Sequence, residues 1–352
     1  MDIVNILRDK ILNIVNELVE EKNFKQPINI NNIVVERPKR QNQGDYSTNA
    51  AMVLGKAISS SPRDLGEIIM FKLTDGELIE NVSLDGPGFL NIKINPKFWD
   101  RLLVEIISNT YKYGQTSFGS GKKVNLEFVS ANPTGPLHLG HVRGAVFGDV
   151  LSRLLEFVGF KVTREYYVND GGAQIGILVR TIYFRYLEKL GECIELPEES
   201  YPGDYLIPIA EKLIEKYGNT LKNLEEGKRD KIIRGLSIDY MMEIIKADLK
   251  SLNIEMDNFF SEQAMINSNG IESSLSTLKD KGLIYKGIID APKGKTYTDW
   301  QAREQLLFKS TEFDDDIDRP IKKSDGSWTY FAPDLAYHAD KLKRGFDVMI
   351  DV

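Results

Sequence analysis

Two of the three histidines in this 352-residue chain, His138 and His141, lie three residues apart in the stretch LEFVSANPTGPLHLGHVRGAVFGDV. Imidazole groups at this spacing can bind a metal ion, donate hydrogen bonds to phosphate oxygens, or serve only as packing and surface residues. An isolated H-x-x-H is most often the last of these, because short motifs have many chance matches. The choice among the three depends on the residues around the pair.

A zinc site would require two histidines four residues apart with a glutamate between them, or cysteine partners. The remaining histidine, His338, is far along the chain, and we interpret it as a helix-surface residue. The single cysteine, Cys193, lies in a polar stretch and is interpreted as a structural thiol. We therefore expect neither a protein-held metal nor cysteine chemistry.

A phosphate site fits the elements that flank the pair. The apolar pattern predicts a strand over 123–129, a helix over 143–158 and a second strand in KVTREYYV, which together form a unit of a parallel sheet. The start of a helix exposes N–H groups that bind phosphate, and Gly140 would let a flat base approach the backbone. Because the chain has neither G-x-x-x-x-G-K-[ST] nor G-x-G-x-x-G, the histidines and the helix end would hold the nucleotide.

The wider sequence predicts two domains. Helical periodicity in DIVNILRDKILNIVNELVEE and alternation around Asp-Gly-Pro-Gly in NVSLDGPGFLNIKIN indicate a small α/β domain over 1–118. The Gly- and Ser-rich YGQTSFGSGKK then marks a boundary. The second domain, over 119–352, has a mostly helical insertion at about 175–285 and ends in a helix near 332–343 and the strand FDVMIDV.

Charge and hydropathy exclude several classes of protein. The net charge of −7 argues against a protein that coats nucleic acid, although a local basic cluster such as ERPKRQ at 36–41 could contact a folded RNA. Apolar runs stop well short of the ~20 residues of a membrane span, and the first residues are no signal peptide. We expect a cytoplasmic protein without a membrane segment.

The run ANPTGPLHLGH resembles the HIGH signature of class I aminoacyl-tRNA synthetases, and the longer EFVSANPTGPLHLGHVRGAVFGDVLSRLLEFVGFKVTREYYVNDGGAQIG is similar to arginyl-tRNA synthetases. Three more stretches resemble the same family: REQLLFKSTEFDDDIDRPIKKSDGSWTYFAPDLAYHADKLKRG, GDYSTNAAMVL and GPGFLNIKI. The resemblance implies an α/β fold with a Rossmann-like parallel-sheet catalytic domain and a helical insertion, preceded by a small tRNA-contacting α/β domain. It implies an arginine–tRNA ligase.

The resemblance also implies the roles of individual residues. The HIGH region would comprise Ala131, Asn132, Pro133, Thr134, Gly135, Pro136, Leu137, His138, Leu139, Gly140 and His141. Within it, His138 and His141 would be catalytic and would bind ATP together with Pro136 and Gly140. Arginine would be bound by Glu127, Ser130, Asn132, Tyr330 and Asp334, and tRNA by Arg37, Lys39 and Arg40. The substrates would be ATP with Mg²⁺, L-arginine and tRNA(Arg), used by a monomer.

The sequence departs from the family in two respects. It has no KMSKS string, and Gly135 stands where some arginyl enzymes place a lysine that takes over the role of that motif. The helical anticodon-binding domain that follows in the family has no counterpart before Val352. We therefore expect a fragment with impaired activity. Two alternatives stay open: an HxGH nucleotidyltransferase acting on a small molecule, and a non-catalytic tRNA-binding fragment.

Overall fold

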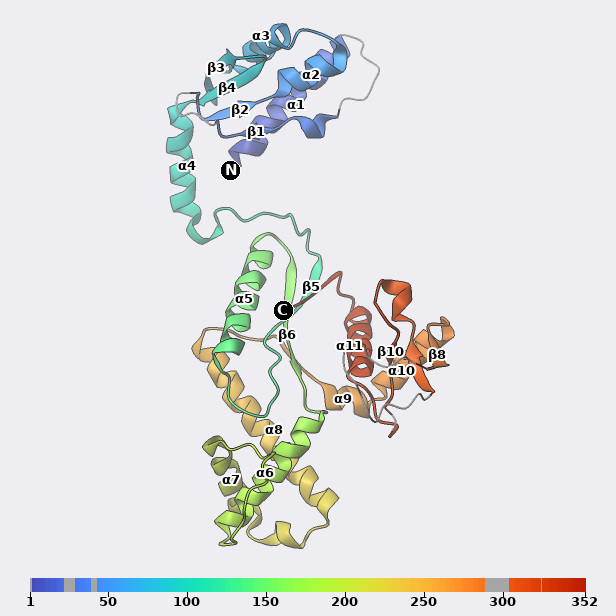
Figure 1. Ribbon diagram of the computed structural model, residues 1–352. Coiled ribbons are helices and arrows are strands. Elements are labelled where there is room, and N and C mark those ends of the chain that lie inside the picture. Colours follow the sequence, from blue (N-terminus) through green and yellow to red (C-terminus); the bar gives the residue numbers. More distant parts are fainter. Residues whose placement is uncertain (1, 22–28, 39–42, 289–303, 324) are drawn as a thin grey trace. The chain divides into compact units, whose positions relative to one another are not determined.

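The computed structural model describes residues 2–21, 29–38, 43–288, 304–323 and 325–352. The chain divides into two compact units, Met1–Gln115 and Thr116–Val352 (Figure 1). The sequence predicts this boundary three residues later, after residue 118. No helix within the described ranges combines the length and the apolar character that crossing a membrane would need.

The first unit packs helices against an antiparallel sheet with the strand order β1-β2-β4-β3. Its elements are α1 (Ile3–Glu21), η1 (Ile30–Asn32), β1 (Val35–Glu36), β2 (Tyr46–Thr48), α2 (Ala50–Ile58), α3 (Pro62–Leu73), β3 (Ile79–Asp85), β4 (Phe89–Ile94), α4 (Pro96–Asn109) and η2 (Thr110–Lys112). Both α3 and α4 begin with proline directly after a side-chain cap, Ser61 and Asn95, as helix starts favour. The apolar stripe of α1 is buried in this core.

The second unit is built on a parallel sheet with the order β11-β5-β6-β7. These strands span Val348–Asp351, Lys123–Glu127, Lys161–Val168 and Asn258–Ser261. The predicted parallel pairing of the strands before and after the histidines is confirmed. Strand β5 ends at Glu127, two residues earlier than predicted. It ends there because Val129 and Ser130 adopt left-handed backbone, with φ of 71° and 41°.

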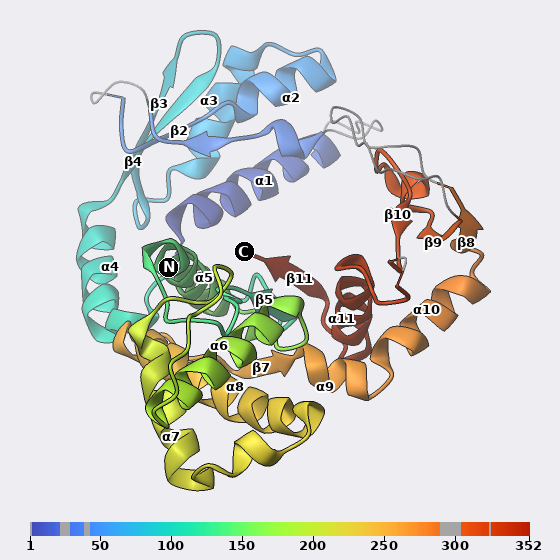
Figure 2. The ribbon, with the colours of Figure 1, turned by 60° about the horizontal axis from the view of Figure 1, so that its bottom comes forward.

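Helices cover both faces of this sheet (Figure 2). On one face, α5 (Leu139–Phe157) and the end of α8 (Glu226–Ser251) pack on Leu126, Phe128 and Tyr166. Gly148 lets α5 approach closely, since a Cβ there would lie 2.2 Å from the Phe128 ring. On the other face lies α11 (Phe331–Lys343). The helix predicted from Arg143 begins four residues earlier, at Leu139, so both histidines belong to its start.

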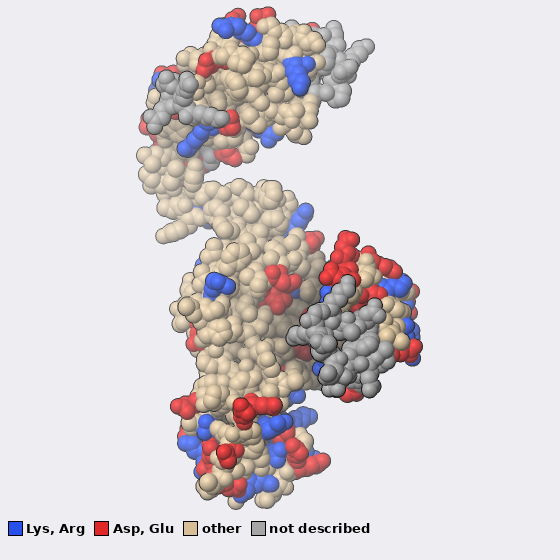
Figure 3. Space-filling model, viewed as in Figure 1, with Lys and Arg blue, Asp and Glu red and all other residues tan. Residues whose placement is uncertain are grey.

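A group of helices follows β5 and β6 along the chain. It comprises α6 (Ala173–Lys189), η3 (Asp204–Leu206), α7 (Ile207–Tyr217), η4 (Thr220–Asn223) and α8, which share an apolar core. The insertion predicted over 175–285 is too long, because β7 at 258–261 returns to the parallel sheet. We call residues 173–251 the helical insertion from here on. Charged side chains of both signs gather over it, whereas α5 exposes the apolar Val146, Phe147 and Leu154 (Figure 3).

The remaining elements form a small subdomain between β7 and α11. They are α9 (Glu262–Asn267), α10 (Gly270–Asp280), β8 (Ile284–Gly287), β9 (Gln305–Phe308), η5 (Ser310–Phe313) and β10 (Arg319–Pro320), with an antiparallel sheet in the order β10-β9-β8. A separate apolar cluster that includes Ile271, Ile321 and Tyr337 joins this part to α11. The subdomain therefore supports the helix that covers one face of the parallel sheet.

Candidate active site

His138 and His141 form the N-terminal cap of α5. The Nδ1 atom of His138 accepts a hydrogen bond from the Gly140 N–H at 3.1 Å, and Nδ1 of His141 accepts one from the His138 N–H at 3.3 Å. Ser or Thr at the cap and Glu or Gln three residues later usually make this reciprocal arrangement, in which two helix-end donors are satisfied by two side chains. Here two imidazoles make it, and their rings stack with centroids 3.6 Å apart.

The cap determines the tautomer of both imidazoles. A neutral imidazole has one N–H and one acceptor nitrogen, so a ring whose Nδ1 accepts must carry its proton on Nε2. Both histidines therefore present an Nε2–H donor away from the cap. Desolvation lowers the pKa of His141, and the neighbouring His138 lowers it further. Two Nε2–H donors thus stand at the positive end of the α5 dipole, which is an arrangement suited to phosphate.

Gly140 has a packing role that the sequence did not reveal. A Cβ at this position would lie 2.9 Å from Cε1 of His138, closer than real Cβ contacts allow. Any larger residue would push the His138 ring away from its cap position. Gly140 is therefore required by the neighbouring imidazole, whether or not a base approaches the backbone.

A strained turn connects β5 to the histidines. The Ser130 N–H donates to the Phe128 carbonyl at 3.0 Å, which closes a γ-turn around Val129 at φ 71°. A β-branched residue is rarely found at positive φ, and such strain persists only where other contacts impose it. Ser130 supplies those contacts: its hydroxyl donates to Glu127 at 2.9 Å and accepts from the Tyr167 N–H at 3.0 Å.

Polar side chains form a row across the parallel sheet. Strand register places Asp351, Glu127, Glu165 and Asn258 next to one another on β11, β5, β6 and β7. Paired residues of adjacent strands point to the same face, so three carboxylates lie side by side. Such a row is stable only if opposite charges cover it.

Helix α11 supplies those charges. Lys341, which is fully buried, donates to Glu127 at 2.9 Å and also to Asp351. Arg344 binds both oxygens of Glu165. Burial alone would raise the pKa of Glu165, but hydrogen bonds from Arg344, Asn258 and Tyr337 outweigh it and lower the pKa to about 2.

Two further carboxylates are compensated less, since a hydrogen bond from Tyr167 to Glu262 and the attraction of His338 for Asp334 do not outweigh desolvation. Desolvation raises the pKa of Glu262, at the start of α9, and that of Asp334, in the first turn of α11. Both lie near Tyr167, whose hydroxyl pKa is raised first by burial and then by these two carboxylates and Glu127. In the described part of the chain, the Asp334 carboxylate has no hydrogen-bond donor of its own. An added cation would therefore be stabilised strongly here.

The predicted arginine-binding residues lie in several places around this region. Glu127 and Ser130 bind each other, and Asn132 donates to Gln174 at 2.6 Å. Tyr330 directly precedes α11, has 72% of its surface exposed and lies near Arg319. The Asp334 N–H reaches the Tyr330 carbonyl at 3.5 Å, so these two residues share one helical turn.

The other predicted residues are placed as follows. His338 is exposed on α11, as predicted, and it also bridges from the Asp334 carbonyl, at 2.9 Å, to the Asp351 carboxylate, at 3.1 Å. Arg37 is exposed in the first unit beside the Tyr46 hydroxyl. Lys39 and Arg40 lie outside the described residues. Cys193 is exposed and unpaired.

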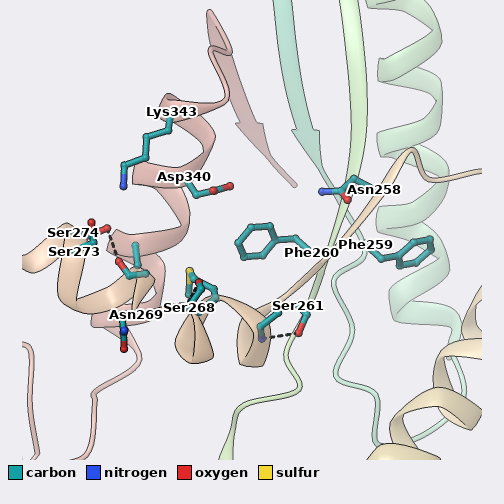
Figure 4. Close-up of a pocket in the computed structure, with 14 residues that line it drawn as sticks. Asn258, Phe259, Phe260, Ser261, Ser268, Asn269, Ser273, Ser274, Asp340 and Lys343 are labelled. Carbon is teal, nitrogen blue, oxygen red and sulfur yellow. Dashed lines mark hydrogen bonds between the residues drawn. The ribbon is translucent and has the colours of Figure 1, made fainter.

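A cavity of about 530 Å³ lies away from the histidines, between β7, α9, α10 and α11 (Figure 4). Phe260 projects toward its centre, and Asp340 and Lys343 reach it from α11. Its remaining polar lining is mainly hydroxyl and amide groups, from Asn258, Ser261, Ser268, Asn269, Ser273 and Ser274. None of the residues predicted from the sequence lines it, and the polar row is represented only by Asn258.

Comparisons with known proteins agree with this architecture. Residues 102–352 match the model of the tRNA synthetases class I (R) catalytic domain, and residues 5–94 match that of the arginyl tRNA synthetase N terminal domain. The chain belongs to the arginyl-tRNA synthetase family. The family assignment made from the HIGH-like run is thus confirmed, as is the α/β fold with a parallel-sheet catalytic domain behind an N-terminal α/β domain.

The chain spans about 60% of the length of the curated relatives that it matches. It is 48% identical over its full length to the arginine–tRNA ligase of Roseobacter denitrificans, covering 61% of that protein. It is 50% identical over 92% of its length to that of Cereibacter sphaeroides, covering 56% of it. The structure of Plasmodium falciparum arginyl-tRNA synthetase shares the fold, with a TM-score of 0.63 and 17% identity over 99% of this chain and 58% of that one.

Several residues of the site were missed by sequence reasoning. Lys341, Asp351, Glu165 and Glu262 gave no motif, and Tyr167 looked like an ordinary strand residue. One signal was available for Asp351, which lies near the carboxyl end of the predicted strand FDVMIDV, where ligands of parallel sheets bind. No strand was predicted before Glu262, because β7 fell within the predicted helical insertion.

Proposed function

We propose that this chain serves the ATP-dependent activation of L-arginine and its transfer to the 3′ end of tRNA(Arg). The observation that supports the proposal is that hydrogen-bond donors for an anion and carboxylates for a cation lie at the same edge of the parallel sheet. A helix start with two Nε2–H donors lies after β5, and two carboxylates whose pKa is raised lie after β7 and on α11. The first suits a polyphosphate, and the second suits a cationic amino acid.

In the first step, ATP with its Mg²⁺ binds at the start of α5. His138 and His141 donate to phosphate oxygens, Gly140 leaves the backbone accessible, and Pro136 adds an apolar contact. A carboxylate oxygen of arginine attacks the α-phosphorus, and the bond to pyrophosphate breaks. Negative charge that develops on the phosphate is stabilised by donors already fixed by their cap, which favours the transition state.

Arginine selection follows from two carboxylates at this edge, the buried Glu262 and the exposed Asp334. A guanidinium is always charged and pairs best with a planar carboxylate, so Asp334 and Glu262 become its partners, with Tyr330 as a hydroxyl neighbour. Glu127, Ser130 and Asn132 surround the α-ammonium and carboxylate groups. Burial makes an ionised Glu262 costly without a cation, and arginine binding would offset that cost, whereas the exposed Asp334 is open to an incoming guanidinium.

The second step transfers the arginyl group. A ribose hydroxyl at the 3′ end of tRNA attacks the carbonyl carbon of the adenylate, and AMP leaves. In the first unit, Arg37, Lys39 and Arg40 contact phosphates of the folded tRNA. Arg37→Ala would then lower the slope of log affinity against log salt by about 1, as expected for the loss of one phosphate contact. A slope identical to that of the wild type would contradict this contact.

Calorimetric binding of arginine and of citrulline, its uncharged analogue, tests the proposal. The wild type should bind arginine at least about tenfold more tightly than citrulline, and Asp334→Asn should remove that preference. Asp239→Asn, which changes an exposed acid of α8, serves as the control and should behave as the wild type. Equal affinity of the wild type for both ligands would contradict the proposal.

Exchange of pyrophosphate into ATP, measured with and without arginine and tRNA(Arg), separates the alternatives. A nucleotidyltransferase for a small molecule would be indifferent to tRNA and to arginine. A non-catalytic tRNA-binding protein would bind tRNA but neither ATP nor arginine.

A further inference from the structure

Tyr205, in η3 of the helical insertion, contacts the turn that leads to the histidines. Its hydroxyl donates to the Thr134 carbonyl at 2.8 Å. Its ring lies over Gly135, where an added Cβ would be 3.2 Å from the Tyr205 oxygen and 3.4 Å from its Cζ. Thr134 and Gly135 precede His138 by four and three residues, so this contact lies directly before the cap of α5.

Three side chains hold successive parts of the same turn. The Tyr166 hydroxyl, from β6, donates to the Ala131 carbonyl at 2.7 Å, and Gln174, at the start of α6, accepts from Asn132 at 2.6 Å. Tyr205 provides the third contact. Tyr166 and Gln174 hold the part of the turn next to β5, whereas Tyr205 holds the part next to the histidines.

Tyr205 is itself fixed by the insertion. Gly203 packs so closely on the ring that a Cβ there would lie 2.0 Å from its Cε1. The adjacent Leu206 is fully buried in the core shared by α6, α7 and α8. A displacement of the insertion would therefore move the Tyr205 ring, and with it the turn before His138.

We propose that Tyr205 is a positioning residue through which the helical insertion sets the geometry of the His138–His141 pair. The inference rests on the proposed role of this pair in ATP binding. Tyr205 acts on ATP through the turn and needs no contact with it. Gly135 is required for this contact, because its lack of a side chain leaves room for the Tyr205 hydroxyl.

A double-mutant cycle tests the inference by ATP titration. Tyr205→Phe removes one hydrogen bond and should weaken ATP binding about fivefold, which corresponds to about 1 kcal/mol. Gly135→Ala should weaken it several-fold in the wild-type background. The same change should cost less in the Tyr205→Phe background, because the oxygen that the methyl group approaches is then absent. Citrulline and arginine affinities should stay unchanged in all variants.

Tyr186→Phe is the matched control. Tyr186 also lies in the insertion and its hydroxyl also donates to a backbone carbonyl, that of Gly218, at 2.6 Å, but it does not contact the turn. It should lose comparable stability without loss of ATP affinity. In the absence of ATP, Tyr205→Phe should shift the imidazole NMR signals of His138 and His141, whereas Tyr186→Phe should not.

Two results would overturn the inference while leaving the proposed function intact: ATP affinity and imidazole signals of Tyr205→Phe that match those of Tyr186→Phe, or an effect of Gly135→Ala that is equal in both backgrounds. Failure of the wild type to bind ATP would instead overturn the proposed function, and the inference with it.

Discussion

The ammonium group of Lys341 lies 2.9 Å from the Glu127 carboxylate, and none of the lysine side chain is exposed. The same group binds Asp351 and lies 4.2 Å from the centre of the Tyr337 ring. One helix residue thus joins the carboxyl ends of β5 and β11. Glu127, which we propose as a ligand of the substrate ammonium group, owes its position to this buried contact.

Replacing Lys341 with methionine should destabilise the second unit by about 3–5 kcal/mol, because Glu127 and Asp351 would lose a buried partner. Urea-induced unfolding followed by tryptophan fluorescence would measure the change, with Trp99→Phe in every protein compared to remove the signal of the first unit. Lys228→Met is the control, since Lys228 and its partner Glu225 are each 75% exposed at 3.6 Å, and it should cost less than about 1 kcal/mol. Similar midpoints for both variants would contradict the structural role of Lys341.

Acid should weaken the fold through Glu165. Its pKa is about 2 in the folded chain against an ordinary value of 4.5, so its contribution is complete above pH 4.5 and is lost as the pH falls toward 2. The full contribution is about 3 kcal/mol. The unfolding free energy of Glu165→Gln should therefore fall less steeply than that of the wild type over this range. Parallel curves of unfolding free energy against pH for the two proteins would contradict the lowered pKa of Glu165.

The pKa values of His141 and His338 should be shifted in opposite directions from the ordinary value of 6.5. Desolvation lowers the pKa of His141, so its contribution to stability is present above pH 6.5 and is lost as the pH falls through its folded value. The hydrogen bond to Asp351 raises the pKa of His338, so its contribution is present below pH 6.5 and is lost as the pH rises through its folded value.

Imidazole NMR signals measure both pKa values, and His141→Gln and His338→Gln assign them. Nitrogen shifts should also show unprotonated Nδ1 atoms in His138 and His141 near neutral pH. An Nδ1–H tautomer in either residue would contradict the cap, because each Nδ1 must then donate rather than accept.

The parts of the candidate site that are local in the chain could be predicted from the sequence. His138, Gly140 and His141 lie between a strand and a helix that the sequence predicts, so a relation to phosphate could be argued from these flanking elements. The start of α5 was placed too late because histidine is not a usual cap residue.

The remaining parts depend on strand order and register. Asp351 and Glu127 are adjacent only because β11 pairs with β5, and neither composition nor periodicity gives that register. A lysine in an amphipathic helix is expected at the surface, so the burial of Lys341 was not predictable either. The left-handed backbone of Val129 likewise follows from tertiary contacts against its own preference.

At a strand position, a glycine variant is usually less stable than an alanine variant, and the strained backbone at Val129 should reverse this order. Val129→Gly removes the penalty of positive φ, whereas Val129→Ala keeps it and loses a similar apolar contact. The glycine variant should therefore be more stable than the alanine variant. At Val162, a half-buried position in ordinary strand backbone, glycine should instead be less stable by about 0.5–1 kcal/mol. The same order at both positions, measured by urea unfolding, would refute the strain.

ATP titration of His138→Asn tests the central claim most directly. Asparagine can still cap α5, because its side-chain oxygen replaces Nδ1, but it has no donor at the position of Nε2. We predict that this variant keeps the thermal stability of the wild type and binds ATP at least about tenfold more weakly. His141→Ala should also lose ATP binding. Wild-type ATP affinity in both variants would contradict the claim that this histidine pair is the phosphate site.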